Sequence, residues 1–157
     1  MERREFIALL GSAAAALPAS AQAQPASRAA RTFAERLVGT WDFVSSENTR
    51  KDGSAFDRWG AGARGMFMLD RAGNYSQIII GSESRVFGAK IFCSFGTYTL
   101  DEGKKSFTTR IKGCSVSSLI GAAQLRSILL LTATELKYSN DVIATGATAT
   151  VLWKRLA

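Results

Sequence analysis

Short segments in which apolar and polar residues alternate run through most of this chain. The alternation is clearest around Leu136 and Tyr138, which share one face, while Glu135 and Lys137 share the other. A period of two residues is typical of a strand that buries one face. Eight such segments are predicted, and turn-forming residues separate several of them. They cover residues 38–47, 64–70, 73–80, 91–100, 105–113, 124–132, 134–139 and 147–156.

The order of these elements indicates an all-β domain. One helical turn precedes the strands, because Thr32 and Glu35 have the spacing of a capping box. No strand–helix–strand rhythm follows, so the eight segments predict an antiparallel up-and-down barrel or a sandwich. The barrel is favoured because the first strand carries Gly39 and Trp41 and the last ends in 151–155, which suggests that the two ends of the sheet meet. A barrel of this size can hold one small ligand.

The first 23 residues have the features of an export signal. Arg3 and Arg4 precede an apolar run over 6–17 that is too short to span a bilayer. Small residues at 21–23 stand where a signal peptidase cleaves. The paired arginines resemble a twin-arginine signal, and an ordinary Sec signal is the alternative. We expect a periplasmic or secreted mature protein without a transmembrane segment. The predicted parts are a signal peptide (1–23), a leader with the helical turn (24–36) and a barrel domain (37–157).

The net charge of +7 raises the question of a nucleic-acid partner. The basic residues are scattered, no run of them exceeds two, and aromatic residues are not interleaved with them. An exported location also argues against a genomic target. Nucleic acid is therefore not an expected partner, and attraction to anionic surfaces or small anionic ligands is the milder interpretation.

Cys93 and Cys114 are the two cysteines of the chain, and an exported protein meets an oxidising compartment. If 103–104 form a two-residue turn with Gly at its first position, Leu100 faces Phe107 on the two flanking strands. Cys93 then falls opposite Cys114 at a non-hydrogen-bonded pair, where the strands approach most closely. This register predicts a structural cross-strand disulfide. The alternatives are two free thiols or a register slipped by one residue.

Four blocks of residues, in order along the mature chain, resemble the bacterial lipocalin-like domain family, whose members are small exported or cytoplasmic barrels. The blocks are 37–41, 52–54 followed by 59–60, 64–76, and 95–98 running on to 135–138 and 153–155. The resemblance implies an eight-stranded barrel and a capacity for small apolar ligands. It implies no particular activity.

The resemblance also implies a role for Trp41 and Arg155. In lipocalins an arginine from the last strand stacks on the tryptophan of the first strand, and the pair closes the floor of the barrel. Gly39 has no side chain, so another group can lie against its backbone. A guanidinium over an indole contributes about 0.5–2 kcal/mol. Direct contact with a ligand is the alternative role for this pair.

Four residues are candidates for ligand binding: Trp59, Tyr75, Tyr98 and Arg126. Arg126 shares its face with Ile128. If that face is internal, Arg126 is a buried cation that needs an anionic partner such as a ligand carboxylate, and if it is external, Arg126 is a solvated charge. Tyr75 and Tyr98 either line the cavity or belong to the core. Trp59 lies in a turn-rich stretch and is either a gate at the barrel mouth or part of a packed loop.

The scarcity of histidine and cysteine excludes several kinds of catalytic and metal-binding site. The chain has no histidine, which excludes His-based acid–base catalysis, Ser-His-Asp triads, haem ligation by histidine and the usual zinc sites. Two cysteines are too few for a thiolate zinc site or an iron–sulfur cluster. No glycine-rich phosphate loop is present. We therefore expect no cofactor and no metal site, and we assign no catalytic residue.

Three functions remain. The expected one is a periplasmic binding or carrier protein for a small hydrophobic or amphipathic molecule, for which an anion is one option. A cavity enzyme of the cyclase or isomerase type, using Tyr75, Tyr98 and Arg126, would show buried polar groups that converge on one point. A filled-barrel interaction module would have large side chains across its interior and no cavity of ligand size. Fold alone does not choose among these three functions. The sequence does not indicate an oligomeric state.

Overall fold

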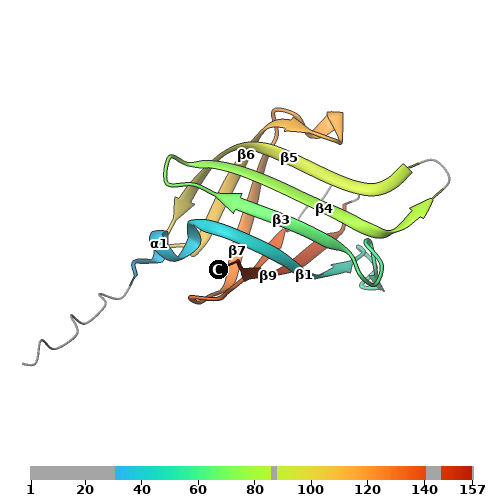
Figure 1. The fold of residues 1–157 in the computed structure, drawn as a ribbon, viewed down its shortest axis with the longest axis horizontal. Coiled ribbons are helices and arrows are strands. Elements are labelled where there is room, and N and C mark those ends of the chain that lie inside the picture. The colour runs from blue at the N-terminus through green and yellow to red at the C-terminus, as the bar shows by residue number, and fades with distance from the viewer. Residues whose placement is uncertain (1–30, 86–87, 141–145, 157) are drawn as a thin grey trace, which may run out of the picture. The chain divides into compact units, whose positions relative to one another are not determined.

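A computed structural model of the chain describes residues 31–85, 88–140 and 146–156, and in this part the strands form one antiparallel sheet (Figure 1). Their bounds are β1 (Gly39–Thr49), β2 (Ala55–Phe56), β3 (Arg64–Leu69), β4 (Asn74–Arg85), β5 (Gly88–Asp101), β6 (Ser106–Cys114), β7 (Ala123–Leu131), β8 (Glu135–Asn140) and β9 (Thr148–Arg155). Two short helices accompany them: α1 (Phe33–Leu37) and the 3₁₀ turn η1 (Ser117–Leu119). The predicted signal peptide (1–23) and most of the predicted leader lie outside the described residues.

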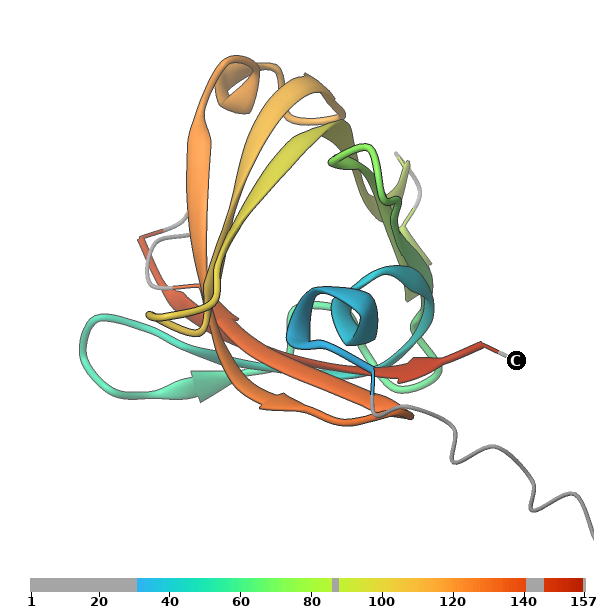
Figure 2. The same ribbon diagram turned by 90° about the vertical axis from the view of Figure 1, so that its left-hand side faces the viewer.

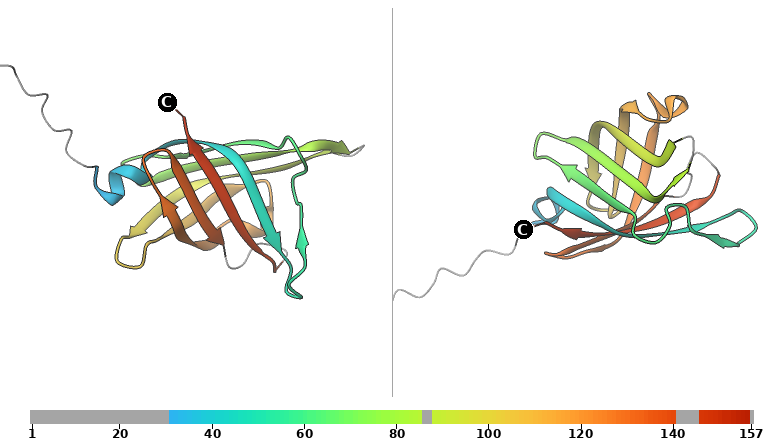
Figure 3. Two further views of the ribbon diagram at one scale, coloured as in Figure 1. Left: turned by 90° about the horizontal axis from the view of Figure 1, so that it is seen from below. Right: turned by 45° about the vertical axis from the view of Figure 1, so that its right-hand side comes forward.

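The sheet closes on itself. Strands β3 to β9 pair in chain order, and β1 pairs with β3 on one side and with β9 on the other. Trp41 of β1 lies opposite Arg155 of β9, and Phe43 lies opposite Trp153. Figure 2 looks into the end of the barrel where α1 lies, and Figure 3 shows β1 beside β9. The predicted eight-stranded antiparallel barrel is therefore confirmed over the sandwich, with β2 as a two-residue addition that the sequence did not predict.

The helical turn before the barrel forms as its sequence predicts. The Thr32 hydroxyl accepts a hydrogen bond from the Glu35 backbone N–H at 3.2 Å, and the Glu35 carboxylate accepts one from the Thr32 backbone N–H at 2.9 Å. This capping box satisfies two amide groups that the first turn leaves without helical partners. The Trp41 indole N–H donates to the Leu37 carbonyl at 3.1 Å, so the end of α1 is tied to β1. Within the described residues, no helix is long and apolar enough to cross a membrane.

Aromatic side chains fill the half of the barrel interior that lies towards α1. The Phe67 ring is at the centre of this cluster, with ring centroids of Trp153 at 5.4 Å, Phe107 at 6.1 Å, Tyr138 at 6.1 Å and Tyr75 at 6.3 Å. All five rings are buried. Burying an aromatic side chain of this kind contributes about 1.5–3 kcal/mol, so this half of the barrel is a packed core that leaves the opposite half for any ligand.

The hairpin of β5 and β6 departs from the predicted register. Leu100 faces Phe107, as predicted, and the pattern holds as far as Gly96 opposite Ile111. A β-bulge follows, because β6 contains one residue more than β5 at this point, and Ser94 rather than Cys93 then faces Cys114. Both cysteines are free thiols. The predicted Cys93–Cys114 disulfide is therefore wrong for this structure, and both alternatives hold: the thiols are free, and the pairing at Cys114 is shifted by one residue.

The turn of the same hairpin also differs from the prediction. The last ladder pair is Asp101 with Ser106, so residues 102–105 form the loop. The Lys105 N–H donates to the Glu102 carbonyl at 3.2 Å. Lys105, with φ of 49°, takes the left-handed conformation that we expected Gly103 to supply. The Asp101 carboxylate accepts a bond from the Lys104 N–H at 3.0 Å, which holds this longer turn together.

Candidate ligand site

A cavity lies in the barrel half opposite α1, beyond the aromatic cluster. Side chains from three strands, the loop before β3 and the η1 turn form its apolar wall: Trp59, Ile79, Phe92, Leu119, Ala149 and Val151. Its polar wall carries two arginines and five neutral residues: Arg58, Arg126, Ser46, Asn48, Gln77, Gln124 and Asn140. Water-sized molecules have about 50 Å³ for their centres. That is room for a few waters or one compact group, so a ligand of this cavity is small or displaces side chains.

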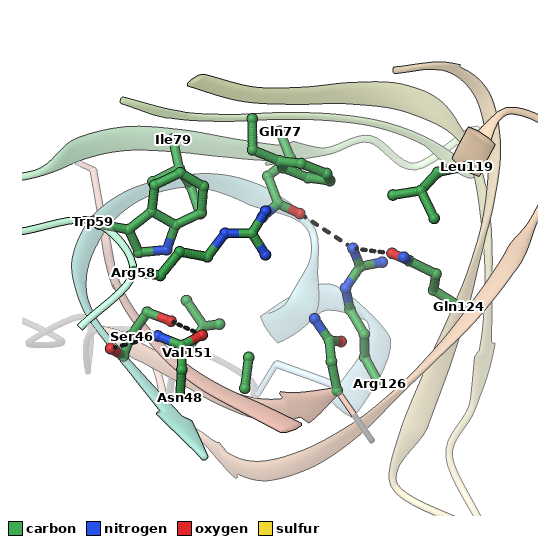
Figure 4. A pocket seen from close by; sticks show the side chains of 13 residues that line it. Ser46, Asn48, Arg58, Trp59, Gln77, Ile79, Leu119, Gln124, Arg126 and Val151 are labelled. Atoms are coloured by element: carbon green, nitrogen blue, oxygen red, sulfur yellow. Dashed lines mark hydrogen bonds between the residues drawn. The ribbon is translucent and has the colours of Figure 1, made fainter. Parts of the chain in front are cut away.

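Arg126 is the buried cation of this site. It comes from β7 and is 1% exposed, so the face that it shares with Ile128 is internal. Its Nη1 donates to the Thr109 hydroxyl, and its Nη2 donates to Gln77 Oε1 at 3.2 Å and to Gln124 Oε1 at 3.3 Å (Figure 4). All three acceptors are neutral, and Nε has no partner within the described residues. The guanidinium is therefore held in place without a compensating negative charge there.

Aromatic rings supply the remaining stabilisation of this guanidinium. The Arg126 Cζ lies 5.5 Å from the Tyr138 ring centroid, 5.6 Å from that of Phe107 and 5.9 Å from those of Phe67 and Tyr75. Ring faces attract a cation, and more strongly in a desolvated site. The aromatic cluster thus lies against one side of the Arg126 guanidinium, and the cavity lies on its other side.

Tyr138 belongs to the aromatic cluster and not to the cavity wall. Its hydroxyl is buried and has no hydrogen-bond partner within the described residues. Burial raises the pKa of Tyr138 above its ordinary value, and the nearby positive charge of Arg126 opposes this shift only in part. The tyrosine is therefore neutral at physiological pH and does not compensate the charge of Arg126.

The loop before β3 brings Trp59 and Arg58 to the cavity. The Asp57 carboxylate accepts hydrogen bonds from the N–H groups of Trp59 at 2.9 Å and Gly60 at 2.8 Å, and these bonds lower the pKa of Asp57. The Ser82 N–H donates to the Trp59 carbonyl at 3.0 Å, which ties the loop to β4. Trp59 is 6% exposed, so the structure places it in the cavity wall as part of a packed loop.

The two candidate tyrosines do not line the cavity. Tyr75 is buried in the aromatic cluster, and its hydroxyl lies 3.4 Å from the Ser94 hydroxyl. Tyr98 lies near the α1 end, where its hydroxyl donates to the Asp70 carbonyl at 2.7 Å. Burial raises the pKa of Tyr98, with a further contribution from the Asp70 charge. Of the four predicted ligand residues, the structure therefore brings together Trp59 and Arg126.

The predicted floor pair forms a contact far from the cavity. The Arg155 Cζ lies 4.0 Å from the centre of the Trp41 ring. Its Nη1 donates to the Val38 carbonyl at 2.9 Å, its Nε donates to the Ala133 carbonyl at 2.8 Å, and its Nη2 donates to the Arg36 carbonyl. A side chain at position 39 would collide with this guanidinium, so the glycine there makes room for it. Neither Trp41 nor Arg155 lines the cavity.

Several cavity residues escaped the sequence analysis. Gln77 lies between Tyr75 and Ile79 on the inward face of β4. A polar residue at such an alternating apolar position predicts a polar group inside the barrel. Gln124 has the same relation to Arg126 on β7. Arg58 carries no such signal, because a turn-rich loop has no fixed periodicity and only the tertiary structure directs its side chain inwards. Among the described residues, no group of three or more His, Cys, Asp or Glu side chains could hold a metal ion.

Comparison with known proteins finds only distant similarity to other structures. No protein-family model and no curated protein matches the chain. Among solved structures, a redesigned β-barrel is 19% identical over 79% of this chain and 95% of its own, with a TM-score of 0.47. A de novo designed fluorescence-activating β-barrel is 13% identical over 78% and 96%, with a TM-score of 0.45. Bovine odorant binding protein, solved with a selenium-containing odorant, is 18% identical over 82% and 75%, with a TM-score of 0.44.

These likenesses are too distant to transfer a ligand or an activity. The chain is an eight-stranded closed antiparallel barrel, and an odorant binding protein is among the structures similar to it. Membership of the bacterial lipocalin-like domain family stays a prediction from the sequence blocks.

Proposed function

We propose that this protein binds a small amphipathic molecule whose anionic group pairs with Arg126, and that it serves as a carrier of that molecule. One observation supports the proposal above the others: Arg126 is almost fully buried at the cavity, and its hydrogen-bond acceptors are all neutral. A buried cation without a negative partner destabilises the empty barrel. A ligand carboxylate or phosphate beside the guanidinium would offset that cost through charge-assisted hydrogen bonds.

The apolar wall is suited to the uncharged part of the same molecule. Trp59, Ile79 and Phe92 present rings and branched side chains to the cavity from the loop, β4 and β5. Apolar surface with a few placed polar groups is the usual composition of a small-molecule site. The small volume restricts the ligand to a compact molecule, smaller than the hydrophobic ligands that an empty eight-stranded barrel could hold.

The proposed place of action is the periplasm or the exterior of the cell. This part of the proposal is supported by the sequence alone, through Arg3, Arg4 and the apolar run that follows them. An exported carrier would meet its ligand outside the cytoplasm. Changing both arginines to lysine should abolish export by a twin-arginine route, and continued export would point to the Sec route.

A cavity enzyme is the second candidate, because buried polar groups converge on Arg126 as such an enzyme requires. The described residues of the cavity wall, however, include no Asp, Glu, Lys, Tyr or Cys. A general acid or base must lie within hydrogen-bond reach of the proton that it moves. Ligand binding needs only the guanidinium and its neutral neighbours, so it is the function that this wall supports best.

Native mass spectrometry of the mature protein, purified gently from the periplasm, tests the proposal first. A bound small anion that is released on denaturation supports it. Isothermal titration calorimetry with two single-ring probes, the anion benzenesulfonate and its uncharged analogue benzenesulfonamide, provides the second test. The anionic probe should bind more tightly to the wild type, and Arg126→Gln should remove that preference.

Arg110 provides the matched control, because it is an exposed arginine on the neighbouring strand β6. The Arg110→Gln variant should bind both probes as the wild type does. Arg126→Lys keeps the charge and should retain part of the preference, which separates a lost charge from a disturbed fold. Equal binding of the two probes by the wild type would overturn the proposal.

A further inference from the structure

A second arginine enters the same cavity from the opposite wall. Arg58 comes from the loop before β3, and in Figure 4 its guanidinium points towards the space that the Arg126 guanidinium also faces. Its Cζ lies 4.8 Å from the centre of the Trp59 ring. Burial lowers the pKa of Arg58 from its ordinary value. The side chain is therefore partly removed from water while still carrying its charge.

The two arginines differ in how they are held. Arg126 has hydrogen bonds to Gln77, Gln124 and Thr109 that fix its guanidinium. Within the described residues, Arg58 makes no side-chain hydrogen bond or ion pair, and its guanidinium lies over the Trp59 ring. Arg126 is thus a preformed anion-binding group, whereas no described residue accepts a hydrogen bond from the guanidinium of Arg58.

The described residues of the cavity wall carry a net positive charge. Its described residues carry the two arginines and no aspartate or glutamate, and the other polar members are neutral amides and a hydroxyl. Two like charges that face each other in a partly dry cavity repel, and water screens them less than at the surface. A ligand with a single negative charge would leave one of the two arginines without a partner.

We infer that the cavity binds a compact dianionic group, held between the guanidinium groups of Arg58 and Arg126. This inference rests on the proposed function and adds the charge and size of the ligand. Guanidinium forks match the geometry of phosphate and carboxylate oxygens. A phosphate monoester and a small dicarboxylate share the required chemistry, which is two negative charges within a few ångströms. The small cavity agrees with a group of this size.

Matched aromatic anions test the charge requirement. Phenyl phosphate and phenyl sulfate have nearly the same shape, but at about pH 8 the phosphate monoester carries two negative charges because its second pKa is near 6, and the sulfate carries one. Phthalate and benzoate form the corresponding dicarboxylate and monocarboxylate pair. Isothermal titration calorimetry at one fixed low ionic strength compares all four. The wild type should bind the better dianion roughly tenfold more tightly than its monoanion, as one additional charge-assisted hydrogen-bond pair would give.

Two variants assign that preference to Arg58. In Arg58→Gln the dianion should bind about as tightly as its monoanion, while the affinity for the monoanion stays within about threefold of the wild type, because Arg126 still pairs with one charge. Arg64→Gln is the matched control, since Arg64 is an exposed arginine at the start of β3. It should leave all four affinities unchanged. Tighter binding of phenyl phosphate than of phthalate identifies a phosphoester ligand, and the reverse order identifies a dicarboxylate.

The outcomes separate the inference from the proposal beneath it. Equal affinities for dianion and monoanion in the wild type, or a preference that survives in Arg58→Gln, would overturn the inference. If none of the four anions binds while benzenesulfonate still binds through Arg126, the inference fails and the proposed function stands. If that probe also fails to bind, both fail.

Discussion

Replacing Arg155 with lysine tests whether the guanidinium, rather than a positive charge alone, closes the floor of the barrel. Three carbonyl groups accept hydrogen bonds from this side chain: that of Arg36 in α1, that of Val38 at its end, and that of Ala133 in the turn between β7 and β8. The plane of the guanidinium also lies against Trp41, with Cζ at 4.0 Å. A lysine ammonium is a compact point charge and does not reach three separate carbonyls while stacking on a ring.

The expected loss follows from these contacts. Lysine would keep about one of the three hydrogen bonds. Each of the two lost bonds contributes about 0.5–1.5 kcal/mol, and we take the middle of that range because the site is partly exposed. The lost stacking on Trp41 adds about 0.5–1 kcal/mol. The free energy of unfolding should fall by about 2.5–3 kcal/mol, which for a domain of this length lowers Tm by roughly 10 °C.

Urea unfolding of the mature protein, followed by tryptophan fluorescence and by far-ultraviolet circular dichroism, measures this change. The m-value should stay constant, so that the shifted midpoint reports stability alone. Lys154→Gln is the control, because Lys154 is the exposed neighbour on β9 and should change stability by less than about 0.5 kcal/mol. An Arg155→Lys variant as stable as the control would refute the argument that the planar guanidinium joins the ends of the barrel.

Three further predictions concern the core, the thiols and alkaline pH. Phe67→Ala should destabilise the barrel by about 3–5 kcal/mol in urea unfolding, whereas Phe95→Ala, at a position that is 57% exposed, should have little effect. Thiol titration of unfolded, unreduced protein should find both cysteines free; finding none would restore the disulfide. Burial raises the pKa of Tyr138, so the unfolded chain loses this proton near pH 10 while the folded chain keeps it. Stability should therefore fall as pH rises above about 10, and less so in Tyr138→Phe.

The sequence predicts the local elements well because their signals lie within a few residues. Thr32 and Glu35 are three positions apart and form the predicted capping box. Leu136 and Tyr138 lie on β8, and both side chains are buried in the barrel interior, as their alternation predicts. Strands β4 and β5 run beyond their predicted ends, to Arg85 and from Gly88, because these segments lack the clear periodicity on which the prediction relied.

The register between β5 and β6 is predicted correctly only for the part of the hairpin near the turn. Counting from the turn gives the correct pairs as far as Gly96, since a ladder propagates two residues at a time. A side chain at position 96 would collide with the Arg110 carbonyl, so the two strands lie unusually close at this glycine, where the bulge follows. The bulge moves Cys114 opposite Ser94, and no turn signal predicts it.

The sequence alone determined that this chain forms short amphipathic strands behind a helical turn, that it has no histidine, and that its two cysteines are too few for a thiolate metal site. Only the tertiary structure decided that Arg126 faces inwards and that Arg58, 68 positions earlier in the chain, shares its cavity. The physical reason is that strand periodicity and capping arise from neighbouring residues. The face of a strand that becomes the interior, and the side chains that meet there, are set when β1 closes against β9.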